Sequence, residues 1–169
     1  MKSCMLFNVL AFLALATVTG CSSSGGASTD SGGPVATTPL KGTIAGKDFI
    51  GKIAIAQPGF ADEGSKKEIS IYDTDVDCSG AQAGGDHHIL TSIEWTAGIA
   101  KNLKLDFSGG DNQTVTFVTG PGENVISNQG RIEVIEAPTD VNAKGKLRLR
   151  ATAESNHVEG EIAVLVCDR

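Results

Sequence analysis

Aromatic side chains are scarce in this chain, which has one Trp, one Tyr and six Phe among 169 residues. Carbohydrate-binding modules stack sugar rings on exposed aromatic faces, so the composition speaks against that class of protein. Trp95 shares the alternation of Ile89 and Ile93, which predicts a packed ring whose N–H is hydrogen-bonded nearby. Tyr72 falls on the opposite side of its own apolar stretch and could be exposed.

Basic charge is also low, with 14 Lys and Arg against 20 Asp and Glu, a net charge of −6. Proteins that bind nucleic acid or an anionic lipid surface electrostatically collect basic side chains into a patch. No stretch of this sequence does so. Nucleic acid and anionic lipid surfaces are therefore excluded as partners.

The sequence lacks an apolar run long enough to span a bilayer, which needs roughly 20 residues. Its longest apolar run extends from Met5 to Val18, follows Lys2, and is broken only by Asn8 and Thr17. A short apolar run behind a basic residue is typical of a cleavable export signal. Residues 1–20 are therefore predicted to be a signal peptide that the mature protein lacks.

Catalytic motifs are missing as well. The sequence has no Gly-x-Ser-x-Gly and no His-Glu-x-x-His, and its histidines are His87, His88 and His157. Adjacent residues on a strand face opposite ways, so His87 and His88 could share a metal only from a loop. We expect a non-enzyme without a cofactor. Convergence of these histidines with acidic residues in one cleft would instead favour a hydrolase or a metal site.

Three carboxylates at alternate positions, Asp73, Asp75 and Asp77, are weak candidates for calcium ligands. An EF-hand loop that began at Asp73 would need Gly and Glu where Cys78 and Gly84 stand. On an extended strand, same-face carboxylates also lie nearly 7 Å apart, too far to share one ion unless the chain bends. The simpler interpretation is a set of acids that ends a strand.

Among the features that are present, the segment Val18-Thr19-Gly20-Cys21 stands where the apolar run gives way to serine and glycine. It resembles the lipobox of bacterial lipoproteins. That resemblance implies cleavage before Cys21, lipidation of its thiol, a membrane anchor made by the lipid, and recognition by the lipoprotein processing and sorting machinery. Ser22 is not the aspartate that retains lipoproteins in the inner membrane, so the outer membrane is expected in a Gram-negative cell. The alternative is a buried or disulfide-bonded Cys21 behind an ordinary signal peptide.

Residues 21–39 are predicted to be the lipidated cysteine and a flexible linker, because serine, glycine, threonine, alanine and proline dominate them. Residues 40–169 are long enough for one domain with a two-layer core. Its apolar residues recur with period two, as in Phe49, Gly51, Ile53 and Ile55, which is typical of half-buried strands. Strands are predicted near 41–45, 49–56, 67–72, 88–96, 103–107, 114–119, 123–127, 131–136, 144–153 and 157–167.

Glycine, proline and asparagine separate nearly all of these stretches, and no window has a helical stripe. The pattern predicts an all-β domain, an antiparallel β-sandwich with a barrel as the alternative. Cys78 and Cys167 remain once Cys21 carries lipid, and an exported chain folds in an oxidising compartment, so we expect them to form a disulfide. Two free thiols are the alternative, because sequence cannot place them close together.

Short glycine-spaced stretches open and close the domain, at Gly42-Thr43-Ile44-Ala45-Gly46-Lys47, Val158-Glu159-Gly160-Glu161 and Val164-Leu165-Val166-Cys167. They look like uncharacterised bacterial lipoprotein domains of the β-sandwich type, and this likeness implies fold rather than function. The prediction is a lipid-anchored envelope protein whose domain binds or supports an envelope protein or polysaccharide. An envelope hydrolase and a calcium-dependent binding module are the alternatives.

Overall fold

The computed structural model describes residues 33–59, 65–79 and 87–168. All regular structure in these ranges is β-strand, which confirms the all-β prediction. Most strands coincide within a few residues with the stretches that alternation predicts. In chain order the strands are β1 (Lys41–Ile44), β2 (Lys47–Ile50), β3 (Ile53–Pro58), β4 (Lys66–Tyr72), β5 (His88–Glu94), β6 (Ala100–Asn102), β7 (Val115–Gly120), β8 (Glu123–Ser127), β9 (Gln129–Glu136), β10 (Lys144–Ala153) and β11 (Asn156–Val166).

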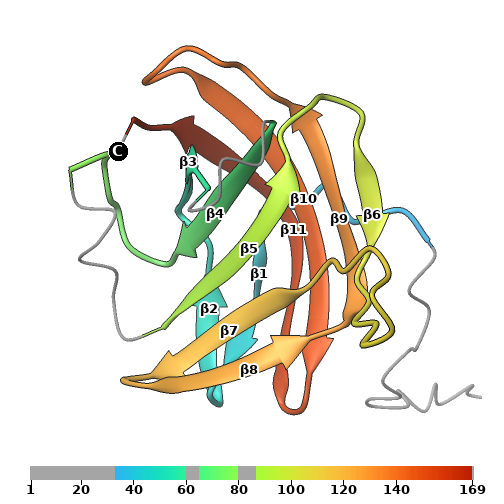
Figure 1. The fold of residues 1–169 in the computed structure, drawn as a ribbon. Coiled ribbons are helices and arrows are strands. Elements are labelled where there is room, and N and C mark those ends of the chain that lie inside the picture. Colours follow the sequence, from blue (N-terminus) through green and yellow to red (C-terminus); the bar gives the residue numbers. More distant parts are fainter. Residues whose placement is uncertain (1–32, 60–64, 80–86, 169) are drawn as a thin grey trace, which may run out of the picture.

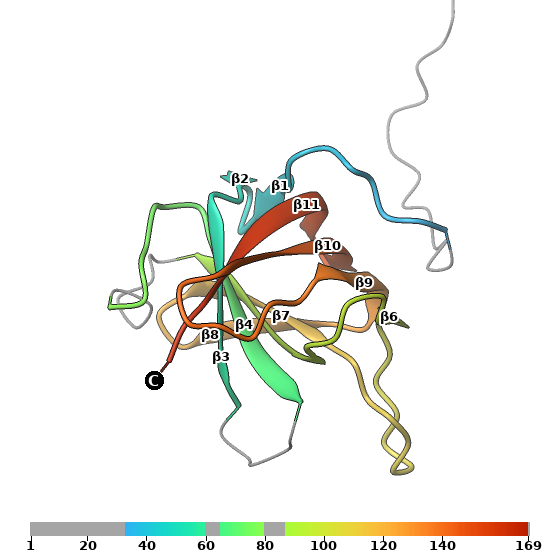
Figure 2. The same cartoon turned by 90° about the horizontal axis from the view of Figure 1, so that it is seen from above.

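These strands form one sheet in the order β6-β9-β10-β11-β3-β4-β5-β7-β8, and β1 pairs with both β11 and β2. Among the described strands, only β11 and β3 pair in parallel, where residues 164–166 run beside residues 54–56. The sheet is open and strongly curled, so that its two halves face each other across a shared interior (Figure 1 and Figure 2). One continuous sheet thus supplies both layers, and it includes a parallel pair that alternation does not reveal.

The interior holds one large group of buried apolar side chains, which we call the inner cluster. They come from every strand except β6 and β8, and from the connections. The cluster comprises Leu40, Ile44, Phe49, Ala54, Ala56, Ile69, Ile71, Ile89, Ile93, Trp95, Leu103, Val115, Phe117, Ile132, Val134, Leu147, Leu149, Ala151, Val158, Ile162, Val164 and Val166. Trp95 lies within it, and its Nε1–H donates to the carbonyl of Pro138 at 2.9 Å, which confirms the sequence prediction.

Residues 33–36 lie across the outer side of β10 and β11, and residues 38–40 hydrogen-bond to the backbone of β11 at Glu161 (Figure 2). Val35 is only 3% exposed, and the carbonyl of Thr38 accepts a hydrogen bond from the Glu161 N–H at 2.7 Å. The chain passes so close to Gly160 that a Cβ there would overlap the backbone of Leu40, and the φ of Gly160 is +143°. Glycine suits this position because it alone adopts such a φ without strain.

The predicted boundary between linker and domain therefore shifts toward the N-terminus. Residues 33–39 make backbone contacts with the sheet and belong to the folded domain. Composition could not show this, because the contacts are made by backbone groups and by side chains far along the chain. Residues 1–32 lie outside the described part of the chain, and with them lie the signal peptide, Cys21 and the rest of the predicted linker.

The predicted strand at 103–107 is wrong. Strand structure ends at Asn102, and after the buried Leu103 the chain enters a loop in which Phe107 is 92% exposed. The carboxylate of Asp106 accepts hydrogen bonds from the N–H and the hydroxyl of Ser108, which bends the backbone into a turn. Local hydrogen bonding of this kind competes with strand pairing and overrides the alternation.

The stretch at 49–56 also departs from the prediction, because it forms two strands rather than one. β2 ends at Ile50 and β3 begins at Ile53. Odd-numbered residues face the interior in β2 but the outer side of the sheet in β3. Phe49 points into the inner cluster, whereas Ile55 is buried on the opposite, outer side of the sheet. The small residues of β3, Ala54 and Ala56, are the ones that face the interior.

Candidate functional site

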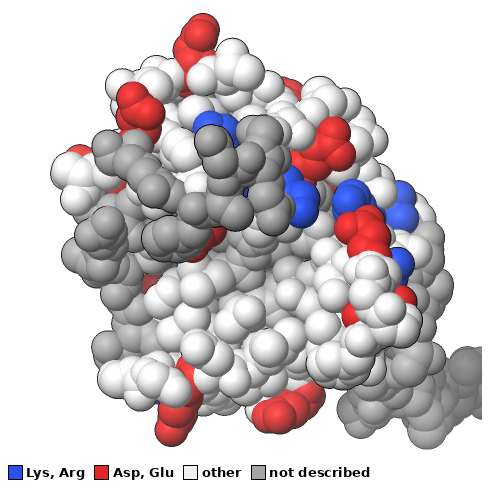
Figure 3. Space-filling view, viewed as in Figure 1, with Lys and Arg blue, Asp and Glu red and all other residues white. Residues whose placement is uncertain are grey.

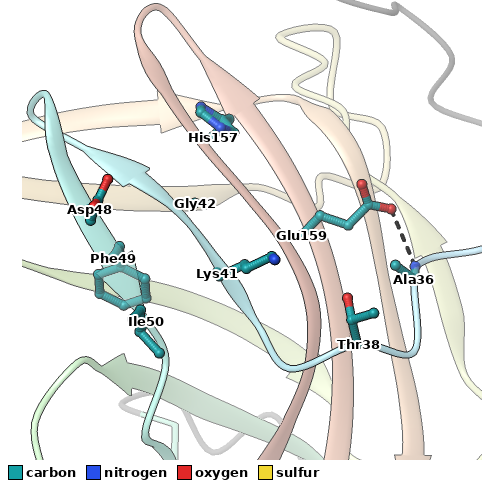
Figure 4. Close-up of a pocket in the computed structure, with 9 residues that line it drawn as sticks. All are labelled: Ala36, Thr38, Lys41, Gly42, Asp48, Phe49, Ile50, His157 and Glu159. Carbon is teal, nitrogen blue, oxygen red and sulfur yellow. Dashed lines mark hydrogen bonds between the residues drawn. The ribbon is translucent and has the colours of Figure 1, made fainter.

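A groove of about 500 Å³ lies on the outer side of the sheet (Figure 4). It lies between residues 33–40, which we call the incoming segment, and the β1–β2 hairpin. The register explains its composition. Lys41 pairs with both Glu159 and Ile50, and Thr43 pairs with both His157 and Asp48, so these side chains share the outer face of three adjacent strands. The groove is lined by Ala36, Thr38, Lys41, Gly42, Asp48, Phe49, Ile50, His157 and Glu159.

The incoming segment forms one wall of this groove and is held by two charged side chains. Arg150 donates from Nη2 to the carbonyl of Gly33 at 3.1 Å. Glu159 accepts a hydrogen bond from the Ala36 N–H at 3.2 Å, and its Oε1 lies 3.7 Å from Nη1 of Arg150. These contacts place residues 33–36 beside the groove.

Both signs of charge surround the groove. Lys41 and Asp48 are exposed on β1 and β2, His157 is exposed on β11, and Glu159 is half-buried. The side chains of Lys41, Asp48 and His157 are exposed, so each can meet a ligand. Ile50 adds an apolar surface that is 59% exposed. A site with charges of both signs around an apolar side chain matches the mixed surface of a protein segment better than a small ion, which carries charge of one sign only.

Next to the groove, ion pairs link β10 to β11. Arg148 donates from Nε to Oε2 of Glu161 at 2.9 Å, and Nζ of Lys146 lies 3.4 Å from Oε1 of the same residue. Partial burial acts to raise the pKa of Glu161, but the hydrogen bond from Arg148 and the charge of Lys146 outweigh it and hold that pKa below its usual 4.5. The charges of Glu161 and Glu136 raise the pKa of Lys146 above its usual 10.5.

The three histidines lie in different surroundings. His157 lines the groove, whereas the ring of His88 stacks on Tyr72 with centroids 5.6 Å apart. Nε2 of His87 lies 3.1 Å from Nζ of Lys47, at the start of β2. The suggestion that Tyr72 is exposed is wrong: its ring is buried on the outer side of β4, beneath the chain that follows that strand.

The three candidate calcium ligands follow β4. Asp77 accepts hydrogen bonds at Oδ1 from the Ser79 N–H and hydroxyl, at 3.0 and 2.6 Å, so this carboxylate stabilises a turn. Asp75 is exposed and Asp73 is half-buried. Within the residues that the structure describes, no group of three or more His, Cys, Asp or Glu side chains could hold a metal ion.

The predicted disulfide is confirmed: Cys78 is bonded to Cys167, with Cα atoms 5.4 Å apart. It fastens residues 73–79 to the end of β11, over a small apolar group that we call the outer cluster. That cluster consists of buried Ile55, Tyr72 and Cys167 with partly buried Ile53, Val76, Cys78 and Leu165.

Sequence reasoning identified His157 but missed the other polar residues of the groove. Lys41 and Glu159 stand more than 100 positions apart, and only the pairing of β1 with β11 brings them together. The glycine-spaced stretches that contain Gly42 and Glu159 were the available signal. They indicated a fold and could not indicate that the two ends of the domain pair with each other.

The chain matches no protein-family model, no curated protein and no solved structure. In the described ranges, no helix is long and apolar enough to cross a membrane.

Proposed function

We propose that the protein is a lipid-anchored component of the bacterial cell envelope whose β-domain binds a partner without catalysing a reaction. The observation that carries the envelope location is the Cys78–Cys167 disulfide, because such bonds form and persist in oxidising compartments outside the cytoplasm. The lipobox-like segment that ends at Cys21 supports the anchor. Under the sorting rule for Ser22, the membrane is the outer one in a Gram-negative cell.

The tether in this proposal is short. Eleven residues, 22–32, separate Cys21 from Gly33, where the chain meets Arg150. In any conformation a segment of this length spans at most about 40 Å. The domain is therefore held close to the lipid surface, with the groove of Figure 4 beside the point where the chain enters the fold.

The binding role rests on the groove and on the separation of the candidate catalytic groups. His87, His88 and His157 lie in three different environments, and Asp77 is engaged with Ser79, which favours binding over hydrolysis or calcium dependence. The partner that suits the groove best is a segment of an envelope protein that carries charges of both signs around an apolar residue.

The anchor is tested by replacing the cysteine that would carry the lipid. We expect Cys21→Ser to accumulate as an unprocessed precursor without acyl chains, whereas Cys4→Ser, within the predicted signal peptide, should mature normally. Intact-mass measurement and N-terminal analysis of membrane-extracted protein decide the outcome. A mature N-terminus at another residue, or a mature mass without acyl chains, would contradict the anchor.

The binding role is tested with a photo-crosslinking residue at position 50, in the groove. Position 126 on β8 is the matched control, because Ile126 is 56% exposed and Ile50 59%. We expect a discrete adduct from position 50 only, and Lys41→Glu should reduce its yield more than Lys144→Glu, a substitution at the start of β10. Equal adduct yields from both positions, or an adduct yield from position 50 that Lys41→Glu leaves unchanged, would refute the groove as the binding site.

A further inference from the structure

Phe107 is the most exposed large apolar side chain in the described part of the chain, at 92%, against 59% for Ile50. It lies in the loop of residues 103–114, which connects β6 to β7 and projects from the domain in Figure 2. Leu105, two residues earlier, is also exposed. An exposed aromatic ring on a projecting loop forgoes the burial that normally stabilises such a side chain, so its position calls for an explanation.

The loop is braced by hydrogen bonds. At its base, Lys104 and Gln113 exchange backbone hydrogen bonds of 2.8 and 3.1 Å. The buried amide of Gln113 donates to the carbonyl of Ser92 at 2.9 Å, which fixes the base of the loop to β5. Near the tip, the Asn112 side chain donates to the Asp106 carbonyl at 3.2 Å. The fold therefore holds Phe107 away from the inner cluster.

Charges on the loop are balanced. Residues 103–114 contain one lysine and two aspartates, and Lys101 on β6 supplies the second positive charge beside them. Nζ of Lys101 lies 3.1 Å from Oδ2 of Asp111. The hydrogen bond and the charge of Lys101 lower the pKa of Asp111. Hydrogen bonds from Ser108, and then the charge of Lys104, lower the pKa of Asp106. Figure 3 shows lysine and arginine side chains over β6 and β9 with acidic side chains among them.

The loop and the chain entry both lie toward one end of the domain, but they point in different directions. Both lie toward the right in Figure 1, and Figure 2 shows the loop pointing to the lower right while the segment that begins at Gly33 lies at the upper right. A tether of residues 22–32, which spans at most about 40 Å, keeps this loop within reach of the bilayer.

We propose that Phe107 inserts into the apolar region of the bilayer that holds the lipid anchor, so that the 103–114 loop faces the membrane. This inference rests on the proposed anchor. One aromatic side chain binds a membrane only weakly, but the tether keeps the loop at a high local concentration of lipid, which makes a weak insertion sufficient to orient the domain. The contact is apolar and does not require anionic lipid.

The experiment uses Phe107→Trp in the mature, lipidated chain, reconstituted in phosphatidylcholine vesicles with and without bromine on the acyl chains. Val141→Trp is the matched control, since Val141 is 48% exposed on the β9–β10 connection, beside the end of β11. Buried Trp95 contributes the same background to both. We expect brominated lipid to quench the tryptophan introduced at position 107 and to leave the one introduced at position 141 unquenched. High salt should not reverse this quenching, because screening weakens charge contacts only.

Quenching of neither introduced tryptophan, or of both equally, would overturn the inference. The intact mass of the same sample reports separately on the anchor. If acyl chains are absent, the proposed anchor fails, and Cys21 can be coupled through its thiol to a maleimide lipid to supply the tether. In that sample, quenching at position 107 alone still supports membrane insertion by the loop, and its absence still refutes it.

Discussion

Both faces of β3 and β4 bury apolar side chains, but these are covered in different ways. On the inner face, Ile69 and Ile71 pack in the inner cluster, which the opposite half of the curled sheet encloses. On the outer face, Ile55 and Tyr72 are buried beneath residues 73–79, a short segment without strand structure. The inner cover is made by hydrogen-bonded strands, whereas the outer cover is fastened by one covalent bond, between Cys78 and Cys167.

This difference shows what each cover contributes to stability. Strands that curl over an interior gain ladder hydrogen bonds and apolar burial together, so the inner cluster is an integral part of the sheet. A segment of seven residues buries little surface for the conformational entropy it loses on ordering. The disulfide offsets this entropic cost because it restricts the conformations that the unfolded chain can adopt. The outer cluster should therefore depend on the disulfide, and the inner cluster should not.

The largest expected effect comes from removing the disulfide by replacing both Cys78 and Cys167 with alanine. The bond closes a loop across 89 positions, and the chain-entropy model gives a loss of about 4–5 kcal/mol in the free energy of unfolding. Chemical denaturation of the variant, with wild-type protein before and after reduction as controls, measures it. An unchanged denaturation midpoint would contradict a stabilising role for the bond.

A double-mutant cycle on the same variants sharpens the comparison. With the disulfide intact, Ile71→Val on the inner face and Ile55→Val on the outer face should each cost about 1 kcal/mol, because both side chains are fully buried. In the disulfide-free background, the cost of Ile55→Val should fall toward zero while that of Ile71→Val persists. Equal persistence of both costs would show that residues 73–79 stay in place without the bond.

The smallest effect concerns the charged part of the outer face, where Glu161 pairs with Lys146 and Arg148. The lowered pKa of Glu161 means that its contribution to stability is present above about pH 4.5 and is lost as pH falls through the folded-state pKa. The raised pKa of Lys146 means that its contribution is present below about pH 10.5 and is lost as pH rises through the folded-state pKa.

Denaturation of wild-type protein across this pH range should therefore show stability declining at both ends. Glu161→Gln should weaken both declines, because it removes the acid that titrates and one partner of Lys146. Glu154→Gln, in the turn between β10 and β11, is the matched control. A pH profile identical for wild type and Glu161→Gln would contradict a contribution from these ion pairs.

Local patterns predicted most strands because a side chain's position on a strand depends only on parity. β10 matches the predicted range of 144–153, and Trp95 occupies the core as its alternation indicates. The pattern failed where other groups intervened. At 103–107 the Asp106 carboxylate bends the chain, and between Ile50 and Ile53 the backbone hydrogen-bonds to Leu40 and Tyr72, which moves Ile55 to the outer face.

The candidate groove could not be predicted from the sequence, for a different reason. His157 was visible as one of three histidines, but Lys41, Asp48 and Glu159 look like ordinary surface charges until β1 is paired with β11. The segment at 33–39 has the composition of a linker, and it belongs to the domain because Arg150 and Glu161, more than 110 positions away, bind its backbone.

The sequence by itself determined the all-β class and most of the strands, and it indicated the pairing of its two domain cysteines, which the structure confirms. Each of these follows from residue type and local alternation, or from the number of cysteines left to pair. Only the tertiary structure decided that one curled sheet supplies both layers, that β11 and β3 run parallel, and that Phe107 is held out in solvent. These features depend on which distant strands meet, and alternation reports that a strand has a buried face without specifying what covers it.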